Sequence, residues 1–229
     1  MKLEYYNHYK VFKQAERYFE EVNDAASNLL INYPYYTFAV QFLISKFERA
    51  IRQGTEADLY AEQTELFADY EPDPNNVPQH VIYTVFRAMC SYYTGRYEET
   101  AKLLNTLIND VSLKKYPQAQ MEIKALLCLQ YCLLKDIDLF NQLSNSVQRN
   151  IRMIGKDACE NVLTFLKILK IAVSEAKREK QKKIAVLIPK FKVMTVNYFA
   201  PTSFIRMDEK FVERLIALEI QRDLTEDVD

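Results

Sequence analysis

Residues 91–100, SYYTGRYEET, place one of the chain's three glycines between two segments whose apolar residues recur at helical spacing. Glycine is costly inside a helix but suits the turn at a helix end, because it adopts a positive φ without a steric penalty. We therefore interpret Gly95 as the turn between two antiparallel helices. This stretch predicts a fold that is assembled from helical hairpins.

The rest of the 229-residue chain favours the same all-α fold. Its three glycines and seven prolines lie mostly between apolar-periodic segments, as expected of residues that disfavour helix interiors. Pro189 interrupts an apolar run and predicts either a kinked helix or an extended segment there. Asp208 is placed to cap a final amphipathic helix. We expect an N-terminal helix over 3–32, hairpins over about 35–69, 79–109, 118–154 and 158–197, and a C-terminal capping helix over 208–222.

The turns recur along the sequence at a nearly constant interval. Gly95 follows Gly54 by 41 residues, and the turn at Lys135 follows Gly95 by 40. With an offset of 40, residues of the second hairpin meet similar residues of the third: Ala88 with Cys128, Tyr92 with Cys132, Tyr97 with Ile137, Leu103 with Leu143, and Leu107 with Val147. Such a period is typical of a helical solenoid, in which each hairpin buries its apolar face against its neighbours. We expect one continuous domain over 1–229.

The second hairpin resembles a tetratricopeptide repeat in the spacing of Tyr92, Gly95, Tyr97, Glu99, Ala101 and Leu104. Ala88 stands at the family's small position, where the two helices cross. Thr84 departs from the family's preference for tryptophan or a large apolar residue, and Thr100 from its preference for alanine. The resemblance covers one hairpin, and the units are longer than the family's ~34 residues. It implies an αα superhelix whose A helices, the first helix of each hairpin, line a groove that binds a protein or peptide.

Side chains on the expected A helices provide candidates for this groove. The chain has 16 tyrosines and no tryptophan, and a buried tyrosine ring can still present its hydroxyl to a polar partner. Packing between helices is the alternative explanation for each tyrosine taken singly. Our groove candidates are Tyr83, Arg87, Ser91 and Lys124.

The sequence predicts neither catalysis nor a metal or cofactor. Glu4 and His8 have a spacing that could share a metal, but they lack the repeated Glu-x-x-His units of carboxylate di-metal bundles. Cys128 and Cys132 are interpreted as small core residues, since no further ligands lie at metal-binding spacing. A Cys–His pair assembled in space, for example with His80, is left open. The chain also contains no glycine-rich phosphate loop and no nucleophile elbow.

Charge supplies the alternative function. The chain carries 30 Lys and Arg against 31 Asp and Glu, so the total charge argues against a nucleic-acid-binding protein. Residues 177–192, the basic segment, could nevertheless bind nucleic acid or anionic lipid; a solvated helix end is the plain interpretation. The acidic residues within 55–75 could meet this segment in a second copy of the chain or within the same chain. The candidates for the basic patch are Lys177, Arg178, Lys180, Lys182 and Lys183.

Features of the termini and of cysteine usage predict a cytoplasmic protein. The first residues, MKLEYYNHYK, contain no apolar signal region, and no segment approaches the ~18 consecutive apolar residues of a membrane helix. The four cysteines do not form the pattern of a secreted disulfide framework, which agrees with a reducing compartment.

Overall fold

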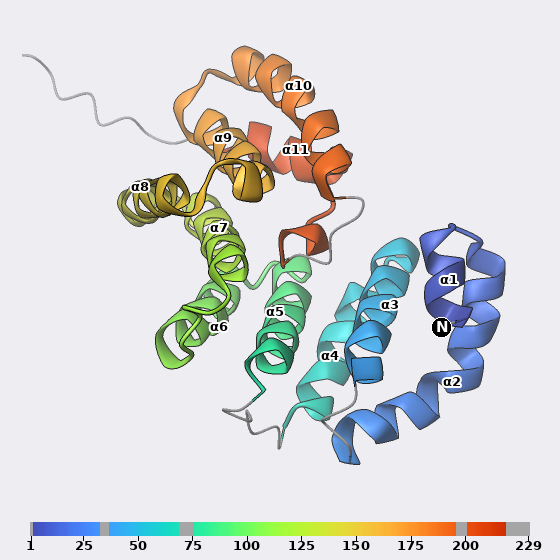
Figure 1. Cartoon of the computed structure of the whole chain (residues 1–229). Coiled ribbons are helices and arrows are strands. Elements are labelled where there is room, and N and C mark those ends of the chain that lie inside the picture. Colours follow the sequence, from blue (N-terminus) through green and yellow to red (C-terminus); the bar gives the residue numbers. More distant parts are fainter. Residues whose placement is uncertain (1, 33–36, 69–75, 196–200, 219–229) are drawn as a thin grey trace, which may run out of the picture. The chain divides into compact units, whose positions relative to one another are not determined.

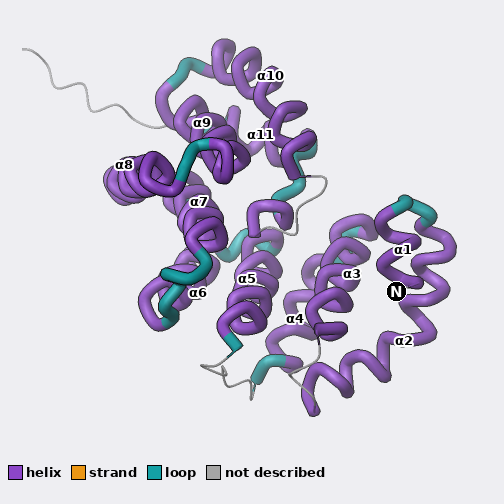
Figure 2. The backbone as a smooth tube through the Cα atoms, viewed as in Figure 1, coloured by secondary structure: helices purple, strands orange, loops and turns teal. Residues whose placement is uncertain are grey.

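The computed structural model describes residues 2–32, 37–68, 76–195 and 201–218 (Figure 1). Within these ranges the chain is built of helices joined by turns and short loops, without a strand (Figure 2). The predicted all-α fold is therefore confirmed. Among the described residues, no helix combines the length and the apolar composition that crossing a membrane would require.

The chain forms two compact units, Met1–Val111 and Ser112–Asp229. The expected continuous domain over 1–229 stays a prediction, and each unit is described by itself. The first unit contains α1 (Lys2–His8), α2 (Phe12–Asn32), α3 (Thr37–Gln53), α4 (Glu56–Leu66), α5 (Val77–Tyr93) and α6 (Tyr97–Asp110). The second contains α7 (Pro117–Leu133), α8 (Ile137–Ile154), η1 (Asp157–Cys159), α9 (Glu160–Ser174), α10 (Lys177–Thr195), η2 (Pro201–Phe204) and α11 (Glu209–Ile216).

One backbone turn recurs in both units. Gly54 and Gly95 have φ of 73° and 79°, as the sequence predicted for glycine at a hairpin turn, and Lys10 and Lys135 adopt the same region with φ of 57° and 61°. In each turn an N–H beyond the helix donates to the carbonyl five residues earlier, the Schellman arrangement that satisfies the open end of a helix. These bonds are Val11 to Tyr6 (2.9 Å), Thr55 to Ala50 (3.0 Å), Arg96 to Ser91 (2.9 Å) and Asp136 to Tyr131 (2.9 Å). What recurs about every 40 residues at Gly54, Gly95 and Lys135 is thus the backbone conformation of the turn.

The turn at Lys10 corrects the expectation of one helix over 3–32. The chain instead forms α1 and α2, which pack against each other as a further hairpin. A lysine in the left-handed region costs free energy that glycine would not, so nothing in the residue types signals a turn at this position. Apolar periodicity continues through the turn and makes the two helices read as one.

The first unit has an aromatic core around α5, which lies beside α3, α4 and α6 (Figure 1). The ring of Phe67 meets those of Tyr83 and Phe86, with centroids 5.3 and 6.1 Å apart. At the crossing of α5 and α6, Ala88 and Thr100 are both fully buried. The Thr100 hydroxyl lies 3.2 Å from the Ala88 carbonyl and 2.9 Å from that of Arg96. These acceptors explain how a threonine fits where the resembling family has alanine.

The second unit is organised around α7, which lies between α8 and α9 and also packs against η2. Its residues from Met121 to Cys132 are buried except at Lys124 and Tyr131. Phe140 of α8 is fully buried, and Phe165 of α9 packs on Phe191 of α10 with ring centroids 5.6 Å apart. An A helix of this unit is therefore covered on most of its circumference.

The C-terminal elements follow the sequence in part. Helix α10 runs through Pro189, so of the two predicted alternatives the extended segment is wrong. Asp208 caps α11 as predicted, accepting a hydrogen bond from the Phe211 N–H at 2.9 Å. Helix α11 covers α10 and α9 with the buried side chains of Phe211 and Leu215. Residues 219–222 of the predicted capping helix lie outside the described residues.

Candidate binding surfaces

Three of the four groove candidates lie on α5 at four-residue intervals, but two of them belong to the interior. Tyr83 is 1% exposed; its ring packs on Phe67, and its hydroxyl accepts a hydrogen bond from Gln79 Nε2 at 3.0 Å. Ser91 is 0% exposed. The prediction that these two side chains line an open groove is not met in this structure, because α4 and α6 cover the faces of α5 on which they lie.

Ser91 belongs to a polar cluster that joins α4, α5 and α6. Its hydroxyl lies 3.0 Å from one carboxylate oxygen of Glu99, and the other oxygen accepts from the Tyr60 hydroxyl at 2.8 Å. The hydrogen bond to Glu99, together with burial, raises the pKa of Tyr60. The Arg96 guanidinium lies over the Tyr60 ring, 4.4 Å from its centroid. Glu99, one of the residues that carry the family resemblance, thus holds the hairpin to the preceding helix.

Arg87 is the groove candidate of the first unit that keeps unused binding capacity. The residue is half-buried, and its guanidinium carbon lies 5.7 Å from the centroid of the Phe67 ring. Its Nε is buried, and no hydrogen-bond acceptor is present for it among the described residues. A buried donor without an acceptor costs free energy, so the site favours any ligand that supplies one.

His80 marks the electrostatic character of the surface near Arg87. Burial lowers the pKa of His80, the positive charge of Arg87 lowers it further, and the negative charge of Asp110 acts in the opposite direction. His80 lies on α5, one residue after the Gln79 that donates to Tyr83. Burial thus disfavours the charged form of His80, and Arg87 adds to this effect.

Lys124, the remaining groove candidate, lies in the second unit. It is half-buried on α7, and its charge acts on the Cys128 thiol of the next helical turn. Burial dominates at that thiol and raises the pKa of Cys128 to about 12. Lys124 is therefore one of the two residues between Met121 and Cys132 whose side chains are not fully buried.

Glu122, two residues before Lys124, was not among the sequence candidates. It is 6% exposed, and one carboxylate oxygen accepts from both the N–H and the hydroxyl of Thr202, at 3.0 and 2.8 Å. The other accepts from Asn161 Nδ2 at 3.0 Å. Burial raises the pKa of Glu122, while the three hydrogen bonds act to lower it. A carboxylate inside the apolar run of α7 was the available signal, because such a group is buried only with partners.

The basic segment is less uniform than its sequence indicates. Lys180 is 6% exposed, and its ammonium group donates to the Leu218 carbonyl at 2.6 Å, so it holds the end of α11 and is wrong as a patch residue. Lys183 pairs with Glu175 at 2.7 Å, which raises the pKa of Lys183, and Lys182 lies 3.7 Å from Glu179. The remaining two candidates, Lys177 and Arg178, are exposed.

The cysteines lie in the interior. All four thiols are free and buried, and burial is the main cause that raises the pKa of each. The pKa of Cys132, like that of Cys128, reaches about 12. A thiolate, which is the nucleophilic form, is therefore strongly disfavoured at these positions. The described residues contain no group of three His, Cys, Asp or Glu placed to hold a metal ion.

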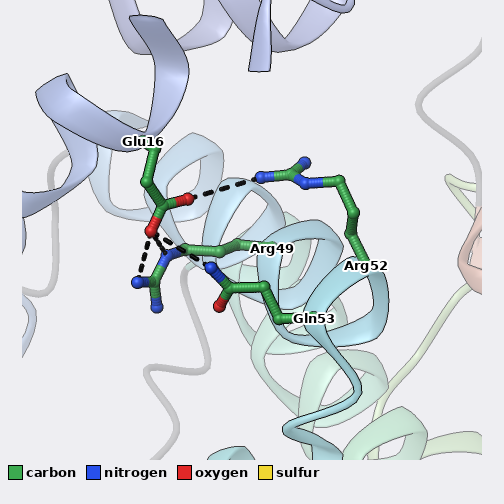
Figure 3. A network of polar contacts seen from close by, with 4 residues as sticks. All are labelled: Glu16, Arg49, Arg52 and Gln53. Atoms are coloured by element: carbon green, nitrogen blue, oxygen red, sulfur yellow. Dashed lines mark hydrogen bonds and ion pairs between the residues drawn. The ribbon is translucent and has the colours of Figure 1, made fainter. Parts of the chain in front are cut away.

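A surface network in the first unit pairs two arginines with one carboxylate. Glu16 of α2 binds Arg49 and Gln53 of α3 through one carboxylate oxygen and lies 3.6 Å from Arg52 through the other (Figure 3). The hydrogen bond from Arg49 is the largest effect on Glu16 and lowers its pKa. Since Arg49 and Arg52 also lie over the rings of Phe19 and Phe12, the network fastens α2 to α3.

Comparison of the chain with protein-family models, with curated proteins and with solved structures gives no match. The candidate surfaces are therefore described from the residues of this chain.

Proposed function

We propose that the chain is a non-catalytic, cytoplasmic scaffold that binds a protein or peptide segment through the surface around Arg87. The observation that carries this proposal is the buried Arg87 Nε, which has no hydrogen-bond acceptor among the described residues. The helical-hairpin architecture and the recurring turn support it, because such arrays present rigid helix faces to partners. On this proposal the hairpins continue as an αα superhelix like that of tetratricopeptide repeats.

The chemistry of Arg87 indicates the kind of segment that would bind. A guanidinium group offers a planar fork of donors that matches a carboxylate in two parallel hydrogen bonds. The ring of Phe67 below it orients the group and excludes water from one face. The positive charge of Arg87, which also acts on His80, favours an anionic group over a cationic one at this guanidinium. The proposed partner therefore presents an Asp, a Glu or a chain-terminal carboxylate next to an apolar residue.

The test is affinity capture from the source lysate with the tagged 229-residue chain as bait, with nuclease and at moderate salt, followed by mass spectrometry. Arg87→Met removes the donors and retains most of the side-chain volume. Arg178→Met is the matched control, because it removes an exposed arginine of the second unit. We expect a small set of proteins with the wild-type chain and with Arg178→Met, and loss of that set with Arg87→Met. An unchanged set in Arg87→Met, with an unchanged melting temperature, would reject Arg87 as the anchor.

The alternative function is binding of nucleic acid or anionic lipid through the basic segment. The exposure of Lys177 and Arg178 at the start of α10 favours it, since the helix N-terminus adds positive potential there. The alternative predicts capture that falls steeply with salt and is lost on nuclease treatment or in the double variant Lys177→Glu/Arg178→Glu. Association of two copies through acidic and basic ends would instead give a salt-sensitive dimer in size-exclusion chromatography.

A further inference from the structure

Glu122 in the second unit is a buried carboxylate with three hydrogen-bond donors, which come from Asn161 and Thr202; we name these three residues the Glu122 cluster. Glu122 lies on α7, Asn161 on α9 and Thr202 on η2. Glu122 and Thr202 are 80 residues apart in sequence. A single carboxylate thus fastens a distant short segment to the middle of an A helix.

The cluster contacts both the backbone and the side chain of Thr202. One oxygen of Glu122 receives both the N–H and the hydroxyl of Thr202. Asn161 Nδ2 donates to the other oxygen at 3.0 Å and lies 3.4 Å from the Thr202 hydroxyl oxygen. The Thr202 hydroxyl can therefore donate to Glu122 while it accepts from Asn161, which uses both of its capacities. An alanine or valine at this position would keep the N–H and lose the other two contacts.

Apolar anchors follow the threonine directly. Phe204, Ile205 and Met207 are buried, as is Thr202 itself at 0% exposure. The pattern is that of a bound peptide: a polar group sets the register, and apolar side chains close behind it fill the surface. Farther along, the Lys180 ammonium group holds the Leu218 carbonyl at the end of α11.

We propose that Glu122 and Asn161 form a peptide-binding site for a short segment with a Thr or Ser followed by large apolar residues, and that residues 201–207 of the same chain are the tethered ligand that fills it. A partner segment of this chemistry enters by replacing residues 201–207. This site is separate from Arg87 and does not depend on the function proposed for that residue. The exchange involves no covalent step.

The test measures binding of a fluorescein-labelled synthetic peptide with the sequence of residues 199–208, FAPTSFIRMD, to the full chain by fluorescence anisotropy. Thr202→Val weakens the tethered ligand and leaves the site intact. Thr164→Val is the control, because Thr164 is a buried threonine of the same unit whose hydroxyl contacts Met194 instead. We expect Thr202→Val to bind the peptide at least about tenfold more tightly than the wild-type chain or Thr164→Val, since hydrogen bonds to a charged group are worth this much.

Two further binding measurements assign the effect to the cluster. Adding Glu122→Gln to Thr202→Val is expected to weaken peptide binding at least about tenfold, because an amide cannot accept all three donors. A labelled peptide with valine in place of its threonine is expected to bind as poorly. The proposal is overturned if Thr202→Val unfolds cooperatively on heating, as the control does, and yet binds the peptide no better than the control.

Hydrogen exchange on the wild-type chain tests the proposal without any substitution. A tethered ligand leaves its site by local opening, so the amides of residues 202–207 are expected to exchange at least about tenfold faster than those in the middle of α7. Equal rates in the two segments would show that residues 201–207 open only with the whole unit, and would overturn the proposal. A dimer in size-exclusion chromatography that persists at high salt, as expected if two copies exchange residues 201–207, would also overturn the assignment to a separate partner.

Discussion

In hairpin α5–α6 the residue with positive φ at the turn is Gly95, and in hairpin α7–α8 it is Lys135, 40 residues later. The same two backbone hydrogen bonds close both turns: Gly95 to Tyr92 and Arg96 to Ser91 in one, Lys135 to Cys132 and Asp136 to Tyr131 in the other. At the helix crossing, however, the buried Thr100 of α6 corresponds to the buried Phe140 of α8. The two hairpins share the geometry of the turn and differ in the side chain that is buried between their helices.

This difference shows that the turn geometry recurs with the 40-residue period, whereas the side chain at the helix crossing does not. Turn geometry depends on backbone hydrogen bonds, which any residue tolerant of the left-handed region permits. The crossing depends on the volume between two helices, which a threonine with hydrogen-bonded hydroxyl and a phenylalanine can each fill in their own hairpin. Polar chemistry then appears at unrelated positions: Arg87 on α5 and Glu122 on α7. Binding specificity therefore cannot be transferred from one hairpin to the other by the offset.

The largest expected effect compares the two crossing residues. Phe140→Ala should reduce the free energy of unfolding of the second unit by about 3–5 kcal/mol, because it removes a fully buried ring and leaves a cavity. Thr100→Ala should cost the first unit about 1 kcal/mol, the typical value of a hydrogen bond. Amide hydrogen exchange in α7 and α5, respectively, measures each loss within its own unit.

Equal losses of unfolding free energy for Phe140→Ala and Thr100→Ala would contradict the difference proposed between the two helix crossings. Leu139→Ala provides the control for Phe140→Ala, since Leu139 is 40% exposed on the same helix. Its replacement should change the free energy of unfolding much less, as expected for a side chain already in contact with water.

A smaller effect is expected when the turn residues are exchanged. Gly95→Ala should destabilise the first unit by about 1–2 kcal/mol, because a Cβ is disfavoured at this φ, although beyond the two neighbouring residues it would meet no atom within 4 Å. Lys135→Gly should stabilise the second unit by up to about 1 kcal/mol for the same reason, less the entropy that glycine adds to the unfolded chain. Urea-induced unfolding measures both changes.

Gly95→Ala and Lys135→Gly are expected to change the free energy of unfolding in opposite directions. If both substitutions were destabilising, the Lys135 side chain would contribute a contact that outweighs its backbone strain. Lys135→Ala, which retains the strain and removes the rest of the side chain, separates these two contributions.

The smallest expected effect concerns the charge environment of His80. Arg87→Met should raise the pKa of His80 toward its ordinary value of 6.5, because it removes the cation that opposes protonation, while burial keeps the pKa below that value. The change is measured by nuclear magnetic resonance titration; with two histidines in the chain, a His8→Gln variant assigns the signals. An unchanged pKa would mean that Arg87 does not contribute to the lowering and that burial is its cause.

The lowered pKa also determines the sign of a pH effect on stability. Because folded His80 binds a proton less readily than unfolded His80, the unfolded chain carries more protons just below pH 6.5. The free energy of unfolding should therefore fall as the pH drops from 6.5 toward the lowered pKa. This loss should be smaller in Arg87→Met and absent in His80→Gln, as measured by urea-induced unfolding across that range.

Local signals in the sequence predicted the elements well. Glycine scarcity and apolar spacing predicted the hairpins, and Asp208 was placed correctly as a cap. The turn at Lys135 was also predicted, whereas Lys10 carried no such signal, since its left-handed conformation is imposed by the surrounding hydrogen bonds. Tyr83 and Ser91 were misplaced because helical spacing shows that residues share a face and does not show what covers that face.

The amino-acid sequence by itself determined the all-α fold, the hairpins and the recurrence of the turn at Gly54, Gly95 and Lys135, because helix formation and helix ends depend on residues a few positions apart. Tertiary structure alone decided that Glu122 would meet Thr202, that Lys180 would hold the Leu218 carbonyl, and that the buried Arg87 Nε would find no acceptor among the described residues. The physical reason is that burial and hydrogen bonding between distant residues depend on how helices pack, and no short-range spacing encodes which side chain a neighbouring helix will cover.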